Sequence, residues 1–576
     1  MINMKSSLTT PFRAVSALLL TATIATAAFA ADSFPVNITV DAAKVTGTLQ
    51  PIWRYFGADE PNYATMKDGQ RLLADLGKLA PGRIYFRAHN LLNTGDGTPA
   101  LKWGSTNAYT EDAQGRPVYD WRGIDRIFDS YLARGVKPLV QIGFMPEALS
   151  THPKPYRHEW RPGLPYDKIF TGWSKPPKDY AKWGELVYQW AKHCVEKYGA
   201  REVETWWWEV WNEANSLPRG YWGGSAEEFR KLHDYAVAGV RRALPTARVG
   251  GPDTASHGGQ FMKDFLEHCL RGKNYATGGT GTPLDFVSFH AKGAPTMRDG
   301  HVRMGISTEL RTIETAFTTF NSYPELKNIP VIIGECDPEG CAACQGPQMA
   351  YRNGTMYSSY TAAAFARLHT LAAFHKINLE GALTWAFTFE DQPWFAGFRQ
   401  IVSNGVPMAV FNVFRMYSLM DANQLNAVSD CETPLDEIIA KGVRGAPDVG
   451  VIATRAPESG PGAHRIAIMA WHYHDDDIAG PNAAVKLAIR GLPAGVREAK
   501  VTHYRIDQNH SNAYAEWLRM GSPVAPNEKQ YAALQKASDL ATLEGSPAGV
   551  AVASDGSATL DFALPRQAVS LVVVEW

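Results

Sequence analysis

The sequence carries almost no net charge. Its 576 residues include 57 Lys and Arg against 58 Asp and Glu, which gives a formal charge of -1 at pH 7. Attraction to nucleic acid or to an anionic lipid surface needs an excess of basic residues, so neither partner is expected. After residue 30 no apolar run is long enough to span a membrane. Internal repeats, low-complexity tracts and a glycine-rich dinucleotide fingerprint after the first strand-like segment are also absent.

Cysteine is scarce as well, with six copies. Three of them lie close together in the segment C-D-P-E-G-C-A-A-C at 336–344. A zinc site would need a fourth ligand and a second ligand pair, and neither lies nearby. We therefore expect a local disulfide or free thiols here, and no metal. The pairing of the six is not determined by the sequence: Cys194, Cys269, Cys336, Cys341, Cys344 and Cys431.

Residues 1–30 have the pattern of a secretory signal. Lys5 and Arg13 give a positive start, an apolar centre rich in Ala and Thr follows, and Ala28-Phe29-Ala30 forms a cleavage site of the A-x-A type. A membrane anchor is the alternative, but the apolar centre is short. We expect a soluble protein that is exported to the periplasm or secreted, where disulfides can form.

The segment 51–428 alternates between strand-like and helix-like stretches. Eight short apolar stretches each end in polar residues, as expected of parallel strands that are buried on both faces. The stretches are 56–60, 82–90, 137–146, 206–215, 247–254, 284–290, 330–336 and 381–390. Between them lie amphipathic helical patterns, for example at 121–135, 226–244 and 361–376. This alternation predicts an α/β fold, a (β/α)₈ TIM barrel, and disfavours a doubly wound open sheet.

The segment 429–576 has a different hydrophobic pattern. Helical periodicity fades, and short alternating strands separated by turn residues predict an accessory C-terminal β-sandwich. The segment 31–50 also alternates, and we expect it to join the sandwich rather than the barrel.

Functional side chains of such barrels stand at the carboxyl ends of the strands. These positions offer two carboxylates, Glu213 after the fourth strand and Glu335 on the seventh, and further polar or aromatic residues near them. The further candidates are Arg87, His89, Asn212, His290, Trp385 and Glu390. Glycoside cleavage needs such a carboxylate pair: one protonates the leaving oxygen and the other meets the developing oxocarbenium ion. A separation of about 5–5.5 Å would make the second a nucleophile and the outcome retention of configuration.

Each candidate also has a structural interpretation. Glu213 would then be a surface glutamate of a loop, Glu335 a salt-bridged barrel residue, His290 a cap of the sixth strand, and Trp385 a core aromatic. The setting W-N-E-A-N at 211–215, directly after three tryptophans, favours catalysis for Glu213. We expect Arg87 to hold Glu335 in its ionised form.

The motif W-N-E-A-N resembles the W-N-E-P-N of clan A retaining glycosidases, in particular glycoside hydrolase family 39. The segments V-Q-I-G-F-M-P, L-D-F-V-S-F-H and, most specifically, 503–523 are also similar to that family. The resemblance implies a barrel with an appended β-sandwich and no metal or organic cofactor. It implies Glu213 as acid/base, Glu335 as nucleophile, and sugar contacts from His290, Trp385, Arg87 and His89. Activities in the family include β-xylosidase and α-L-iduronidase.

The chain departs from the family pattern around the sugar. The nucleophile lies in G-E-C rather than T-E-W, and the sixth strand ends in His290-Ala291-Lys292 rather than His-x-Tyr. The loop between Trp385 and Glu390 is shorter than in the family. A lysine at this place suits an acidic or differently hydroxylated sugar.

The sequence thus predicts an exported retaining exo-glycosidase that releases terminal sugars from oligo- or polysaccharides, first of all a β-xylosidase acting in xylan degradation. Rival interpretations are an α-L-arabinofuranosidase or another exo-glycosidase, an endo-acting hydrolase, and a non-catalytic carbohydrate-binding protein on the same barrel. The expected partner is the carbohydrate alone, with a homo-oligomer left open.

Overall fold

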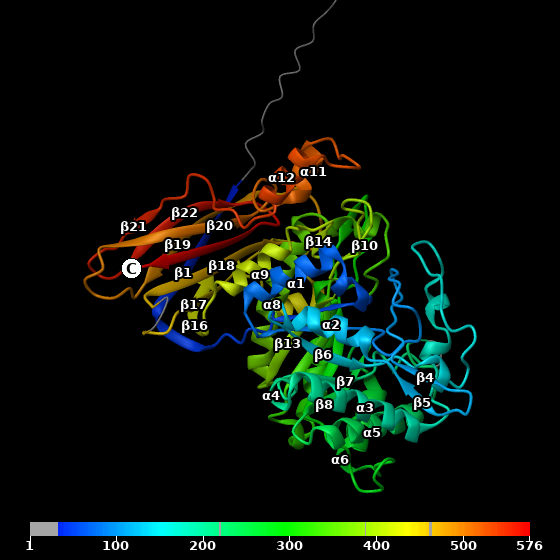
Figure 1. Ribbon diagram of the computed structural model, residues 1–576. Coiled ribbons are helices and arrows are strands. Elements are labelled where there is room, and N and C mark those ends of the chain that lie inside the picture. Colours follow the sequence, from blue (N-terminus) through cyan, green and yellow to red (C-terminus); the bar gives the residue numbers. More distant parts are fainter. Residues whose placement is uncertain (1–32, 218–219, 386, 460–462) are drawn as a thin grey trace, which may run out of the picture.

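A computed structural model describes residues 33–217, 220–385, 387–459 and 463–576. The expected signal segment 1–30 lies outside the described residues. Figure 1 shows two bodies, a helix-covered barrel and a curved sheet that carries the C-terminus. Both were expected from the sequence.

The first body is a closed barrel of eight parallel strands, in the order β12-β13-β2-β3-β6-β7-β8-β9. Each of the eight expected stretches overlaps one of these strands, so the predicted barrel is confirmed. In chain order the strands are β2 (Tyr55–Ala58), β3 (Ile84–Ala88), β6 (Val136–Ile142), β7 (Trp207–Val210), β8 (Arg248–Thr254), β9 (Phe286–Lys292), β12 (Val331–Asp337) and β13 (Leu379–Trp385). All residues of β7 and β12 are buried, because side chains fill the barrel on one face and pack under helices on the other.

Helices cover the outside of the barrel. Their apolar stripes explain their positions: in α2 the buried residues include Ile124, Ile127, Phe128 and Tyr131, spaced at helical intervals. Helix α5 begins with a capping box between Ser225 and Glu228. The helices up to residue 418 are α1 (Lys67–Leu79), α2 (Arg122–Leu132), α3 (Tyr180–Tyr198), α4 (Ala200–Val203), α5 (Ala226–Ala243), α6 (Gly259–Arg271), α7 (Ile306–Asn321), α8 (Thr355–His375) and α9 (Phe411–Ser418).

Three short hairpins decorate the loops of the barrel. They are formed by β4 (Tyr109–Glu111) with β5 (Pro117–Tyr119), β10 (Thr296–Arg298) with β11 (His301–Arg303), and β14 (Val402–Ser403) with β15 (Val406–Pro407).

The second body is one nine-stranded sheet in the order β21-β20-β23-β18-β17-β16-β1-β19-β22. It curls until its two edge strands approach each other, so that one face encloses an apolar core. The strands are β1 (Ser33–Thr48), β16 (Asn423–Ser429), β17 (Asp448–Arg455), β18 (Arg465–Tyr473), β19 (Asn482–Arg490), β20 (Glu498–Ile506), β21 (Gly549–Ala551), β22 (Ala558–Leu564) and β23 (Val569–Glu575). The helices α10 (Leu435–Lys441), α11 (Ala513–Arg519) and α12 (Glu528–Ala537) accompany it.

Strand β1 comes first in the described chain but lies inside this second sheet. It pairs in parallel with β19 and antiparallel with β16. Its alternate residues Val36, Ile38 and Val40 are buried in the core of the sheet.

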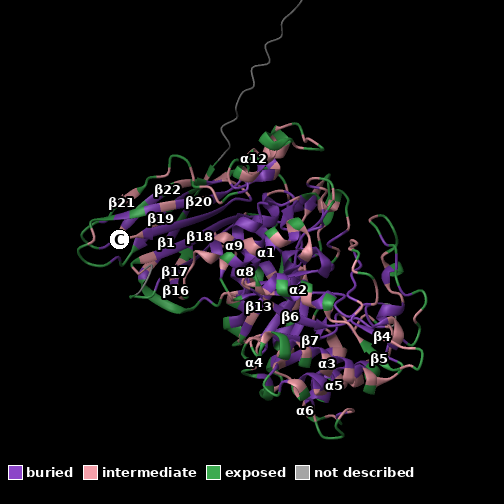
Figure 2. Cartoon of the chain, in the orientation of Figure 1, coloured by how far each residue is buried: buried purple, intermediate pink, exposed green. Residues whose placement is uncertain are grey.

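The outer face of the sheet packs against the barrel helices. Trp471 of β18 and Leu571 of β23 belong to the same apolar cluster as the barrel core. Arg367 of α8 reaches across to Asp448 of β17 at 2.7 Å, and Asp448 also accepts a hydrogen bond from the Trp471 indole at 2.8 Å. Figure 2 shows the buried residues continuing from the barrel into the sheet. The sheet and the barrel therefore share a buried interface.

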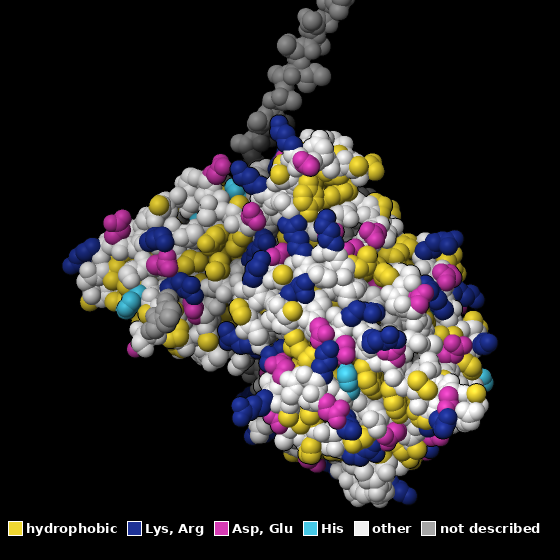
Figure 3. Space-filling view, viewed as in Figure 1, with side chains coloured by type: hydrophobic (Ala, Val, Ile, Leu, Met, Phe, Trp, Pro, Cys, Tyr) yellow, Lys and Arg dark blue, Asp and Glu magenta, His cyan; other side chains and the backbone are white. Residues whose placement is uncertain are grey.

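The surface agrees with the nearly neutral composition. In Figure 3 basic and acidic side chains are interspersed over the face shown. Among the described residues no helix is both long and apolar enough to cross a membrane.

Candidate active site

Glu213 stands just beyond the end of β7, in a backbone turn that few side chains adopt. Its φ is 46° and that of Trp211 is 72°, both in the left-handed region. Two contacts hold this turn: the Glu213 amide donates to the Asp253 carbonyl at 2.8 Å, and the Trp211 indole donates to the Tyr221 carbonyl at 2.9 Å. Strained backbone of this kind gathers at functional sites, where the surrounding structure must hold it in place.

Glu335 enters the same region from β12. It is the register partner of His290 on the neighbouring strand β9. The Nδ1 atom of His290 lies 2.8 Å from Glu213 Oε1 and 3.9 Å from Glu335 Oε1. The two carboxylate oxygens cannot be farther apart than the sum of these distances. This limit includes the roughly 5–5.5 Å carboxyl separation of retaining glycosidases.

The charges around Glu335 keep it ionised. Lys292 Nζ lies 2.6 Å from its Oε2, and Arg87 Nη1 and His89 Nε2 each lie 3.7 Å from its Oε1. Burial alone would raise the pKa of Glu335, but the positive charges of Lys292, His290 and Arg87 hold this pKa well below its usual range. The carboxylate is thus available as a nucleophile at neutral pH.

His290 is a doubly bound histidine. Its Nδ1 meets Glu213 and its Nε2 meets Asp253 Oδ2 at 2.7 Å. Burial would lower the pKa of His290, but the charges of Asp253 and Glu335 raise it to about 10. The ring is therefore an imidazolium that donates at both nitrogens. It fixes the orientation of Glu213. His290 is therefore more than the cap of the sixth strand that the structural interpretation suggested.

Arg87 is a fully buried neighbour of Glu335. The guanidinium has no exposed surface; it pairs with Glu209 at 2.5 Å and with Asp253, and donates to Asn212 Oδ1 at 3.0 Å. Its predicted influence on Glu335 is present, but a direct sugar contact is not possible for a fully covered side chain. Arg87 acts on a ligand only through the residues that it orients.

Asn212 is buried as well. Its Oδ1 is bound by Arg87, and its buried Nδ2 has no hydrogen-bond partner in the part of the chain that the structure describes. Buried amide donors are rarely left unpaired. This nitrogen is as covered as the Arg87 guanidinium, so the expected sugar contact of Asn212 stays a prediction.

His89 and Trp385 form one aromatic wall. Their ring centroids are 4.3 Å apart, and the indole of Trp385 donates to Asp59 Oδ2 at 3.4 Å. Burial and the charge of Arg87 hold the pKa of His89 well below its usual range, so the ring is neutral. Trp385 is 2% exposed and lies on Gly57, where an added Cβ would come within 2.5 Å of its ring. Only the edge of a platform for a sugar remains accessible there.

Glu390 does not fit its expected role. Its two carboxylate oxygens accept the backbone amides of Asp68 and Gly69 at 2.8 and 3.0 Å, in the first turn of α1. Carboxylates stabilise helix N-termini by these bonds and by the helix dipole. We therefore correct the prediction of a sugar contact: Glu390 caps α1.

Other polar residues at the strand ends were not singled out from the sequence. Asp253 is the penultimate residue of β8, Asp59 follows β2 with Lys102 bound to it at 2.7 Å, and Asp337 ends β12. The first and fifth strands, like the fourth and seventh, have an acidic residue near the carboxyl end of an apolar stretch. Reading those two ends as well would have found Asp59 and Asp253.

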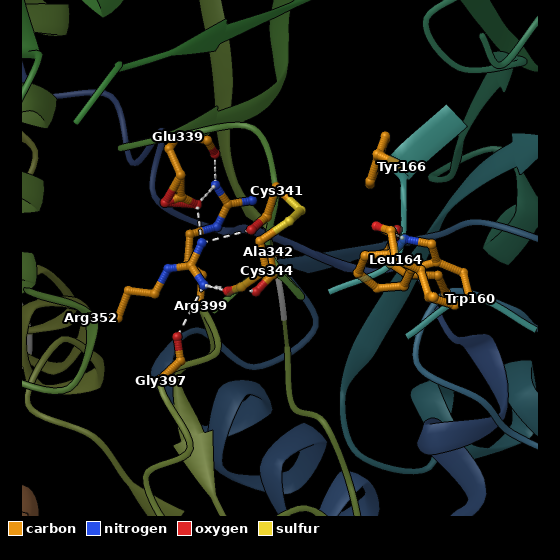
Figure 4. The surroundings of a disulfide bond; sticks show 12 residues. Trp160, Leu164, Tyr166, Glu339, Cys341, Ala342, Cys344, Arg352, Gly397 and Arg399 are labelled. Atoms are coloured by element: carbon orange, nitrogen blue, oxygen red, sulfur yellow. Dashed lines mark hydrogen bonds and ion pairs between the residues drawn. A yellow bond between two sulfur atoms is a disulfide. The ribbon is translucent and has the colours of Figure 1, made fainter. Parts of the chain in front are cut away.

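The cysteine-rich loop follows Glu335 directly. Cys341 and Cys344 form a disulfide, whereas Cys336 is a buried free thiol that donates to Glu309 at 3.0 Å. Figure 4 shows Arg352 and Arg399 converging on Glu339 beside this disulfide, with Trp160, Leu164 and Tyr166 lying across from it in the view. Within the described ranges no group of three or more His, Cys, Asp or Glu side chains is placed to hold a metal ion.

Comparison with known proteins identifies the family. Residues 36–558 match the glycosyl hydrolases family 39. The chain belongs to this family. It is therefore a glycoside hydrolase of a retaining family, and its substrate is a carbohydrate.

Among similar proteins is a β-xylosidase of Caldicellulosiruptor saccharolyticus, 25% identical over 514 residues that cover 88% of this chain and 92% of the relative. An α-L-iduronidase of Mus musculus is 26% identical, over 88% of this chain and 76% of the relative. The crystal structure of a monomeric β-xylosidase from Caulobacter crescentus CB15 superposes with a TM-score of 0.71 at 20% identity, over 94% of this chain and 99% of that one. The last comparison confirms the two-body fold of this family 39 member.

Proposed function

We propose that this family 39 protein is a retaining exo-glycosidase that releases terminal β-xylosyl residues. The observation that carries the mechanism is the position of His290 Nδ1 between Glu213 and Glu335, at 2.8 and 3.9 Å. Two carboxylates that share one histidine contact fit a double displacement, in which the pair lies close together. Relatives named β-xylosidase over most of the chain support the choice of sugar.

In the first step Glu335 attacks the anomeric carbon. Its Oε2 is bound by Lys292, while Oε1 lies on the side of His290 and Glu213, so Oε1 is placed to form the new bond. The glycosidic carbon–oxygen bond breaks, and Glu213 gives its proton to the leaving oxygen. Because Glu213 Oε1 already accepts from His290, the proton resides on Oε2.

In the second step the roles reverse. Glu213, now a carboxylate, removes a proton from water, the water oxygen attacks the anomeric carbon, and Glu335 leaves as a carboxylate. The sugar is released with its original anomeric configuration. The cations around Glu335 favour its departure as an anion.

The enclosed position of the carboxylates supports an exo mode. The side chain of Glu335 is 8% exposed and that of Glu213 is 22% exposed. Carboxylates with so little exposed surface favour a substrate that enters by its end over one that binds along its interior.

A second candidate is a glycosidase for a terminal uronic acid, of the α-L-iduronidase kind. It is favoured by Lys292, whose side chain is 17% exposed and puts an ammonium group beside the nucleophile. Relatives named α-L-iduronidase are about as similar to the chain as the β-xylosidases are. A lysine in this place offers a partner to a sugar carboxylate.

The experiment is a panel of aryl glycosides, with the β-D-xyloside, the α-L-arabinofuranoside and the α-L-iduronide compared for kcat/KM. Proton NMR of the first-formed product gives its anomeric configuration. Preference for the xyloside with retention supports the first proposal, and preference for the iduronide supports the second. An inverted product contradicts both, and no turnover of any glycoside or natural oligosaccharide favours a carbohydrate-binding protein.

We also propose that the protein is exported. The signal-like pattern at 1–30 and the Cys341–Cys344 disulfide support this, because structural disulfides persist in oxidising compartments. Expression of the full chain in a Gram-negative host, followed by fractionation and N-terminal sequencing, tests the proposal. A mature chain beginning at Ala31 in the periplasm or medium is expected, and an uncleaved cytoplasmic chain would refute it.

A further inference from the structure

Lys292 is held between two carboxylates at the ends of neighbouring barrel strands. Its Nζ lies 2.6 Å from Glu335 Oε2 and 2.6 Å from Asp337 Oδ2. The register of β9 and β12 places Lys292 opposite Asp337, so the second contact is built into the sheet. Asp337 is completely covered, and its Oδ1 accepts the backbone amide of Trp385 at 2.9 Å. Its carboxylate is thus fixed by three neighbouring strands.

Asp337 belongs to a buried row of alternating charges. Arg399 Nη2 lies 3.3 Å from Asp337 Oδ2, and Arg399 Nη1 lies 2.7 Å from Glu339 Oε1. Glu339 then meets Arg352 at 3.0 Å, and Arg352 donates to the carbonyl of Cys341 at 2.6 Å. The row therefore runs from Glu335 to the disulfide loop, as its far part in Figure 4 shows. Its signs alternate at every step, which is what makes so many buried charges tolerable.

The charge of Lys292 depends on Asp337 more than on Glu335. Burial would lower the pKa of the lysine, but Asp337 first and Glu335 second raise it above its usual value. Burial also raises the pKa of the Asp337 carboxyl in spite of Arg399 and Lys292. Each charge in this group is therefore maintained by its neighbours.

The proposed function removes one of these charges during the reaction. When Glu335 Oε1 bonds to the anomeric carbon, the carboxylate becomes a neutral ester, while the proton of Glu213 leaves with the departing group. Lys292, whose side chain is 17% exposed, then loses one of its two counter-charges. An ammonium that is largely removed from water and lacks a counter-charge is unfavourable.

We propose that Asp337 is a positioning residue for the covalent step, acting through Lys292. It holds the ammonium against the future ester oxygen and supplies its counter-charge while Glu335 is neutral. The inference rests on the proposed double displacement, because only a covalent intermediate neutralises Glu335. The proposal explains two differences from the family pattern together. The segment G-E-C-D supplies Glu335 and Asp337, and His290-Ala291-Lys292 supplies the lysine between them.

The test is a double-mutant cycle of Asp337→Asn and Lys292→Met. The probe is 2,4-dinitrophenyl β-D-xyloside, or the corresponding glycoside of the sugar that the wild type prefers, and the readout is the rate constant of the initial dinitrophenol burst. In the wild-type background Asp337→Asn should slow glycosylation on the order of 100-fold, because the ester then leaves Lys292 unpaired. In the Lys292→Met background, Asp337→Asn should change the burst rate constant by no more than about twofold.

A merely structural role for Asp337 gives a different result. Its bonds to Arg399 and Trp385 are the same in both backgrounds, so an equal loss in both would overturn the proposal, as would a wild-type rate in Asp337→Asn. Asp234→Asn is the matched control, since it removes a fully buried carboxylate paired with His268 at 3.0 Å on α5. Thermal unfolding of every variant separates misfolding from a specific loss.

The outcomes also separate the role of Asp337 from the proposed glycosidase function on which it rests. If the wild type releases dinitrophenol from no glycoside in a burst or in steady state, the proposed function fails and the inference with it. If the wild type shows covalent labelling of Glu335 and the cycle shows no coupling, only the role of Asp337 fails.

Discussion

The backbone amide of Glu213 donates a hydrogen bond of 2.8 Å to the carbonyl of Asp253, so the proposed proton donor is fastened to the neighbouring strand of the barrel. The Asp253 side chain accepts from His290, which in turn binds the Glu213 carboxylate. Main chain and side chain of Glu213 are thus both fixed from β8 and β9. Such support from neighbouring elements is what a catalytic group needs to keep its geometry.

Replacing Glu213 by Gln removes the proton donor while it leaves the shape of the site intact. We expect kcat to fall by about 10²–10⁴-fold for glycosides whose leaving groups need a proton. Dinitrophenyl glycosides need none for the first step, so their burst should survive while the later turnover is slow. Steady-state and stopped-flow absorbance measure the two.

Glu204→Gln provides the comparison for Glu213. Glu204 is an exposed residue just before β7 that accepts from the Thr246 hydroxyl at 2.6 Å. It should retain wild-type kinetics. Equal losses in both variants would contradict the assignment of Glu213.

Replacing Lys292 by Met should move the acid side of the pH profile. Lys292 makes the largest contribution to holding the pKa of Glu335 below its usual range. The wild type therefore keeps an ionised nucleophile as pH falls, and loses activity only below the ordinary glutamate range. Without the ammonium, the pKa of Glu335 rises and the acid limb of log kcat/KM against pH shifts to higher pH. An unshifted limb would show that Lys292 does not govern the ionisation of Glu335.

The corrected role of Glu390 predicts an effect on stability rather than on sugar binding. Glu390→Ala removes both acceptors for the amides of Asp68 and Gly69, so the free energy of unfolding should fall by about 0.5–2 kcal/mol. KM should stay at the wild-type value. Denaturant unfolding and steady-state kinetics check the two statements, and a large rise in KM with unchanged stability would restore Glu390 to the sugar site.

The barrel could be predicted because two features of the sequence mark each of its strands. Each is apolar throughout, since both faces are buried, and each ends in polar residues where the site lies. Glu213 and Glu335 follow from that rule without knowledge of any contact. The closed order of the eight strands then brings the ends of β7 and β12 into one mouth.

Contacts that depend on register could not be predicted. The pairing of β9 with β12 has an irregularity between Ile333 and Glu335, and this sets Lys292 opposite Asp337. The cap that Glu390 forms on α1 joins residues more than three hundred positions apart. The Cys341–Cys344 pairing likewise depends on a loop that Arg352 folds by binding its carbonyls. Periodicity contains no information about such contacts.

The most direct test of the double displacement is to trap the intermediate. The wild type is incubated with the 2-deoxy-2-fluoro glycosyl fluoride of its preferred sugar, digested with pepsin, and the labelled peptide is sequenced by tandem mass spectrometry. The account predicts one sugar per chain, attached as an ester to Glu335, and regain of activity as the label hydrolyses. A label on another residue, or none in an enzyme that turns over the parent glycoside, would contradict it.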